Sequence, residues 1–258
     1  MIIEYYLIDP TGNITILVRS EVPVEKQPAI AELLMKKEPC AEQVGFVGNN
    51  SLRMAGGEFC GNAAISTAAL IQLEKGAETG SEGRLLLDVS GAENKVGISA
   101  ERISENEFIC RAEMPKPISV EKCVLSYNSK DYDFIAVDFG SIIHFVCDGR
   151  MEKASAEEAI KIWSDQLGRD CVGVMFLDKE SMELSPLVYV RNPPSLFWES
   201  SCASGSSAAG MALAAEQGRQ IEASFKEPGG ILSVSASPVG EIILKGKAKI
   251  IKKSMLEI

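Results

Sequence analysis

Two cysteines, Cys60 and Cys202, each stand directly before a stretch made largely of small residues such as Ala, Ser and Gly. Such a stretch predicts a helix that is buried on every side, because it has no polar face to present to water. A sulfur at a helix N-terminus lies beside unpaired backbone N–H groups, which stabilise the thiolate and lower the pKa of the thiol. Both cysteines are therefore candidates for an acid or a base in proton transfer.

The same arrangement occurs twice, and a thiolate and a thiol on opposite sides of one carbon atom could invert that carbon. One sulfur would remove a proton from one face while the other delivers a proton to the opposite face. The amides that open the helices could hold a carboxylate, on which charge accumulates as the α-carbon loses its proton. We therefore predict a cofactor-independent amino acid racemase or epimerase. The predicted contacts at the helix starts are Gly61, Asn62, Ala203 and Ser204.

The other cysteines and the histidine give no competing site. The seven cysteines are odd in number and widely spaced, which does not favour a disulfide framework. The sequence has no CxxC pair, and His144 is its only histidine, so the spacing of a zinc site is missing. His144 lies in a strand-like run, and we interpret it as a packed core residue. We expect neither a metal nor a cofactor.

Acidic residues dominate the charge, since 36 Asp and Glu against 26 Lys and Arg give a net charge of −10 over 258 residues. This charge repels phosphate backbones and anionic lipids, so we expect no nucleic acid or membrane partner. The first residues are acidic rather than signal-like, and no apolar run reaches the roughly 20 residues of a membrane span. We expect a cytoplasmic protein with a small-molecule amino acid substrate, and a homodimer is a candidate assembly.

Short runs that alternate apolar and polar residues, typical of half-buried strands, dominate the sequence. Strands are predicted at 2–8, 14–19, 84–90, 107–114, 132–139, 171–178, 184–191 and 241–251. Helices are predicted at 24–37, 61–75, 155–167 and 203–217, the third with a capping box of Ser155 and Glu158. The prediction is an α+β chain with more strand than helix, in which each cysteine-led helix is wrapped by its own sheet.

Two prolines in the segment 114–119 interrupt strand pairing and mark a predicted boundary between two halves. We place the halves at 1–117 and 118–258, with the last strand free to pack back on the first half. The cysteine-led helices look like an internal repeat, because one ends at Glu-Lys-Gly and the other at Glu-Gln-Gly.

At these helices the sequence resembles the diaminopimelate epimerase family, whose two halves carry cysteine motifs of the forms CGNG and CGTG. The motifs stand here as Cys60-Gly61-Asn62-Ala63 and Cys202-Ala203-Ser204-Gly205. The resemblance implies two pseudo-symmetric halves, each a barrel-like sheet around a central helix, with the active site between them. It also implies substrate-binding roles for Asn13 and Glu199. Asn13 could instead close a turn, and Glu199 could instead cap a helix start.

The sequence departs from diaminopimelate epimerases where those enzymes carry a Glu-Arg-Gly segment that grips the distal end of the substrate. Pro193-Pro194-Ser195 stand at that place here. Residues 56–63, Gly-Gly-Glu-Phe-Cys-Gly-Asn-Ala, are similar to histidine racemases of the same superfamily, which makes histidine the first substrate prediction. Three alternatives stay open: diaminopimelate itself, another small acid isomerised with one structural cysteine, and a binder of amino acids without turnover.

Overall fold

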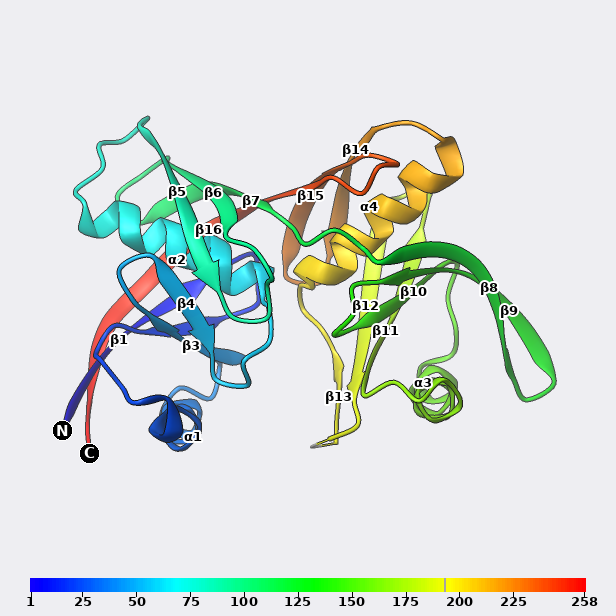
Figure 1. Ribbon diagram of the computed structural model, residues 1–258, viewed down its shortest axis with the longest axis horizontal. Coiled ribbons are helices and arrows are strands. Elements are labelled where there is room, and N and C mark those ends of the chain that lie inside the picture. Colours follow the sequence, from blue (N-terminus) through cyan, green and yellow to red (C-terminus); the bar gives the residue numbers. More distant parts are fainter. Residues whose placement is uncertain (193) are drawn as a thin grey trace. The chain divides into compact units, whose positions relative to one another are not determined.

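The chain forms two compact units in the computed structural model, which describes residues 1–192 and 194–258 (Figure 1). The first unit comprises Met1–Glu113 and Leu244–Ile258, and the second comprises Met114–Ile243. The α+β fold class is confirmed, since strands outnumber helices in both units. Pro193 lies outside the described residues. That the halves are separate domains divided between 117 and 118 stays a prediction.

The first unit closes its strands into a ring around one central helix, α2 (Gly61–Glu74). The strands follow the order β1-β2-β3-β4-β5-β6-β7-β16, and β16 pairs with β1 to complete the ring. Their bounds are β1 (Ile2–Asp9), β2 (Thr15–Val18), β3 (Gln43–Val47), β4 (Ser51–Met54), β5 (Glu82–Val89), β6 (Val96–Arg102), β7 (Glu107–Glu113) and β16 (Ile242–Glu257).

Helix α2 fills the interior of this ring. Every residue from Gly61 to Gln72 is buried, and the mostly small side chains let the strands approach the helix closely. The larger side chains Ile65 and Leu70 join Phe108 of β7 in one core cluster. The predicted buried helix wrapped by its own sheet is confirmed in this unit.

The second unit also packs its strands around a cysteine-led helix, but its described strands do not close into a ring. The order is β15-β14-β12-β11-β10-β9-β8, in which β15 also pairs with β16, and β15 and β8 are not neighbours in the described part of the chain. Helix α4 (Ala203–Gln217) packs on this row and is buried along most of its length. The bounds are β8 (Ser119–Tyr127), β9 (Lys130–Asp138), β10 (Ile143–Asp148), β11 (Cys171–Asp178), β12 (Glu183–Val190), β13 (Ser195–Trp198), β14 (Ile221–Glu227) and β15 (Gly230–Ala236). Strand β13 pairs with β12 only at the side of this row.

A second helix in each unit connects a pair of parallel strands. Helix α1 (Gln27–Lys37), preceded by the 3-10 turn η1 (Val24–Lys26), joins β2 to β3, and α3 (Lys153–Leu167) joins β10 to β11. The capping-box prediction for α3 is wrong. The N-cap is Glu152, whose carboxylate accepts the Ser155 N–H at 2.8 Å, because the helix begins two residues before Ser155.

Candidate functional site

Cys60 is the N-cap of α2, and its Sγ accepts the backbone N–H of Ala63 at 3.4 Å. Its thiol donates to Oε1 of Gln43, the first residue of β3, at 3.0 Å. The predicted residues Gly61 and Asn62 form the buried first turn of the helix directly after it. The half-buried sulfur is thus held both by the helix start and by a strand of the ring.

Gln43 links Cys60 to Asn13, which lies between β1 and β2. Gln43 Nε2 donates to Asn13 Oδ1 at 2.5 Å and to Thr15 Oγ1 at 2.7 Å. Asn13 Nδ2 in turn donates to Glu42 Oε2 at 2.6 Å. The structure therefore joins Asn13 and Cys60 in one hydrogen-bonded network. Gln43 was not among the predicted site residues, because one glutamine at the start of a short strand carries no motif.

Cys202 occupies the same position at the start of α4. It is the N-cap, its Sγ accepts the Gly205 N–H at 3.3 Å, and the residue is 8% exposed. Glycine is needed at position 205, because a Cβ there would stand 2.3 Å from the sulfur of Met175 and 3.1 Å from the sulfur of Cys202. The predicted residues Ala203 and Ser204 lie between them in the first turn of the helix.

Ser204 connects Cys202 to His144 of β10. Its Oγ lies 3.6 Å from Cys202 Sγ and 2.9 Å from His144 Nε2. His144 is fully buried, and burial lowers the pKa of its imidazole to about 3, so the ring is neutral at physiological pH. Gly173 makes room for the ring, because a Cβ there would stand 2.1 Å from Nδ1. These contacts agree with the interpretation of His144 as a packed core residue.

Both thiols hold their protons more tightly than a free cysteine does. Burial raises the pKa of Cys60 to about 11, and the charge of Glu58 adds to this against the opposing amides of the helix start. Burial also raises the pKa of Cys202 well above its usual range, and the carboxylates of Glu199 and Glu227 raise it further. The prediction that a helix start gives these thiols a net lower pKa is wrong, because desolvation outweighs the amides.

Two acidic residues act on Cys202. Glu199 follows β13, and its backbone N–H donates to the carbonyl of Pro186 at 3.0 Å. Glu227, the last residue of β14, accepts the backbone N–H of Cys202 on Oε2 at 2.6 Å. Glu199 was among the predicted site residues, whereas Glu227 was not, because it follows the cysteine by 25 residues with no motif around it. Glu199 thus lies close enough to the start of α4 for its charge to act on the Cys202 thiol.

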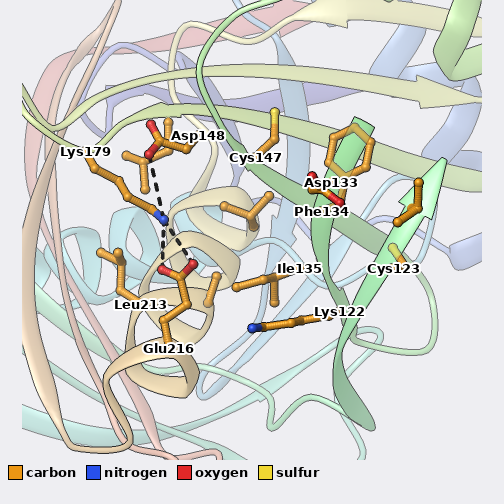
Figure 2. A pocket seen from close by; sticks show the side chains of 14 residues that line it. Lys122, Cys123, Asp133, Phe134, Ile135, Cys147, Asp148, Lys179, Leu213 and Glu216 are labelled. Carbon is orange, nitrogen blue, oxygen red and sulfur yellow. Dashed lines mark hydrogen bonds and ion pairs between the residues drawn. The ribbon is translucent and has the colours of Figure 1, made fainter. Parts of the chain in front are cut away.

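A cavity of about 520 Å³ lies elsewhere in the second unit, between the C-terminal half of α4 and strands β8 to β11 (Figure 2). Lys179 pairs there with Glu216 of α4 at 2.9 Å and reaches Asp148 at 3.9 Å. Among the described residues, those that line this cavity include none of the predicted site residues. The cavity lies beside β8, where the row of strands ends.

Within residues 1–192 and 194–258, no group of His, Cys, Asp and Glu side chains is placed to hold a metal ion. All seven cysteines are free thiols. No helix in the described part of the chain combines the length and the apolar character needed to cross a bilayer.

Comparison with known proteins gives one family. Residues 2–253 match the family described as the histidine racemase CntK N-terminal domain. A histidine racemase of Fusobacterium nucleatum subsp. nucleatum is 33% identical over 219 residues, which cover 82% of this chain and 81% of that protein.

Solved structures share the fold at low sequence identity. A structure described as a predicted epimerase from Pseudomonas aeruginosa has a TM-score of 0.69 at 13% identity and covers 99% of both chains. A probable proline racemase from Agrobacterium radiobacter has a TM-score of 0.67 at 14% identity, over 99% of this chain and 93% of that one. These structural matches support the fold alone.

Proposed function

Because the chain belongs to the histidine racemase family, we propose that it racemises free histidine by means of two cysteine thiols. The observation that carries the proposal is the repeated geometry of the two sulfurs. Each caps a buried helix, and each accepts a backbone N–H from the first turn of that helix. The family relationship favours histidine over diaminopimelate, the alternative substrate that the resemblance left open.

In the proposed mechanism one cysteine acts as a thiolate and the other as a thiol. The thiolate takes the α-proton, the Cα–H bond breaks, and the electron pair is delocalised into the carboxylate. The thiol donates its proton to the opposite face, which forms the enantiomer and exchanges the protonation states of the two cysteines. Cys60 removes the proton from one enantiomer and Cys202 removes it from the other. The scheme requires no cofactor.

Substrate binding is assigned to the residues around the two helix starts. The amides that begin with Gly61 and Ala203 hold the carboxylate, where they stabilise the charge that develops as the proton leaves. Asn13 and Asn62 help to orient the ammonium and carboxylate groups, and Glu199 is the acidic contact from the second unit. Ser204 contributes its amide to the same set.

The test is deuterium incorporation at the α-carbon of L-histidine and D-histidine in D₂O, followed by proton NMR together with chiral chromatography. Cys60→Ala and Cys202→Ala are each expected to lower racemisation by about 10²–10⁴-fold, the usual contribution of a placed acid or base. Cys40→Ala and Cys123→Ala are the matched controls, because both remove a thiol outside the site. Normal racemisation by either site variant would contradict the proposal.

The remaining alternatives give different results. A binder without turnover would show no exchange but would bind histidine in calorimetry. An isomerase of another small acid would show no exchange with histidine, and with its own substrate it would tolerate one of the two cysteine substitutions. A homodimer and a cytoplasmic location stay predictions, and light scattering coupled to size-exclusion chromatography checks the first.

A further inference from the structure

Glu227 is a buried acidic side chain in direct contact with the start of α4. It ends strand β14 and is 6% exposed. Its Oε2 accepts the backbone N–H of Cys202 at 2.6 Å, and its Oε1 accepts the hydroxyl of Ser206. One carboxylate therefore anchors both the residue that carries the thiol and the first turn of the helix behind it.

The first unit shows that the fold does not need this anchor. Strands β5 and β14 each follow a cysteine-led helix, and both end in a buried, exposed, buried pattern. The last residue of that pattern is Val89 in β5 and Glu227 in β14. Four residues after the cysteine, α2 has Ala64 where α4 has Ser206. The first unit thus packs an apolar pair at the positions where the second places a hydrogen-bonded carboxyl and hydroxyl.

The charge of Glu227 also bears on the thiol. Burial raises the pKa of Glu227 to about 8, and the neighbouring Glu199 carboxylate raises it further against its two hydrogen bonds. Above that pH Glu227 is ionised, and a second negative charge on Cys202 becomes more costly. His144 contacts Cys202 only through Ser204 and is neutral, so it does not offset these carboxylates.

Building on the two-cysteine function above, we propose that Glu227 is a positioning residue for Cys202. Its hydrogen bonds fix the N-cap residue of α4, and once Glu227 is ionised its charge favours the Cys202 thiol over the thiolate. In the pH range where it is ionised, Glu227 thereby biases the enzyme toward Cys202 as the proton donor and Cys60 as the proton acceptor.

The experiment measures the alkylation of each cysteine by iodoacetamide against pH, with mass spectrometry to separate the peptides. Glu227→Gln removes the charge, while the amide oxygen can still accept the Cys202 N–H and the amide nitrogen can donate to Ser206 Oγ. We expect half-maximal alkylation of Cys202 to shift by about one pH unit to lower pH, the usual effect of one neighbouring charge. Cys60 in the same samples should keep its profile. Glu222→Gln, an exposed charge on the same strand, is the matched control and should move neither profile.

Glu227→Val removes the hydrogen bonds together with the charge, and it serves as the second variant if Glu227→Gln does not fold. It copies the valine of β5, and it should shift the Cys202 profile in the same direction. An unmoved Cys202 profile in a folded variant would overturn the proposal. This readout needs no turnover, so it is independent of the proposed function, which fails instead if Cys202→Ala racemises normally.

Discussion

The two cysteine-led helices hold the same place in their units but have different surroundings. The parallel strand pairs show the difference. In the first unit Leu17 of β2 is paired with Gly45 of β3, and in the second unit His144 of β10 is paired with Gly173 of β11. The thiol of the first unit is held by a neutral glutamine amide. The thiol of the second lies next to a hydroxyl that reaches a buried imidazole, and two carboxylates act on it. The cysteine-led helix is therefore repeated in the two units, but the groups around its thiol differ.

This difference makes the two sulfurs unequal as acids. Both are buried enough to resist ionisation, but only Cys202 has two carboxylates that add to the effect of burial. When one of the two thiols loses its proton, Cys60 is the one that does so more easily. Two chemically equal cysteines would lose their protons equally easily. The difference between Cys60 and Cys202 can therefore be tested at each sulfur.

The largest effect is expected in the pH dependence of kcat/KM. The pKa of Cys60 is raised to about 11, so the fraction of thiolate grows as pH rises toward that value. Below the pKa this growth is about tenfold per pH unit, which gives roughly 30-fold between pH 7 and pH 8.5. The measurement is kcat/KM for L- and D-histidine across that window.

The two substrates provide an internal check. Enantiomers have equal free energies, so kcat/KM must be the same in both directions at every pH. A flat profile from pH 7 to pH 8.5 would mean that one thiolate already exists at neutral pH, and the raised pKa would then not describe the enzyme that turns over.

A smaller effect is expected in thiol reactivity. At pH 9 Cys60 should be alkylated faster than Cys202, because two acidic residues disfavour the Cys202 thiolate and Cys60 is less buried. Peptide mass spectrometry of samples quenched over time gives both rates, and exposed Cys40 serves as the reference. Equal rates at the two sites would remove the asymmetry.

Substitution of Gln43 should have a modest effect. Gln43→Leu removes the hydrogen bonds to Cys60, Asn13 and Thr15 and should lower kcat/KM about fivefold, in keeping with about 1 kcal/mol for a hydrogen bond. The matched control is Cys171→Ala, since Cys171 begins β11 as Gln43 begins β3. A similar loss in both variants would show that the effect is not specific to Cys60.

Substitution of Gly45 and Gly173, which occupy matching positions in β3 and β11, should change activity least but should change stability clearly. A Cβ at Gly173 meets the ring of His144, whereas a Cβ at Gly45 meets the flexible end of Leu52 at 2.7 Å. Gly173→Ala should therefore lower the free energy of unfolding by about 1–3 kcal/mol and Gly45→Ala by less than about 1 kcal/mol. Urea titrations of both variants measure the free energies of unfolding. A larger loss in Gly45→Ala than in Gly173→Ala would contradict the close contact of His144 with Gly173.

Composition was enough to predict the two central helices, because a helix with so few polar residues has no place on a protein surface. Several strands were missed. Strand β4 has only four residues, and β14 ends with Glu227, a charged residue at a buried position that breaks the apolar and polar alternation. The sequence likewise gives no indication that β8 ends the row of strands in the second unit without pairing with β15.

The site was harder to predict than the fold. Cys60 and Cys202 were chosen from local sequence, and their N-cap geometry needs only the residues that follow them. Gln43 and Glu227 reach these cysteines from strands 17 and 25 residues away, so their contacts depend on strand register. The direction of the pKa shifts was mispredicted for the same reason, because desolvation comes from the whole fold while the helix amides are local.

The return of β16 to the first unit has a consequence for synthesis. Residues 244–258 leave the ribosome after every other strand of the ring, so β1 and β7 wait with one edge unpaired while the whole second unit is made. The second unit can fold first, and the interior that holds α2 is sealed only when β16 arrives. A nascent chain stopped before Leu244 would expose both edges, and exposed strand edges promote aggregation.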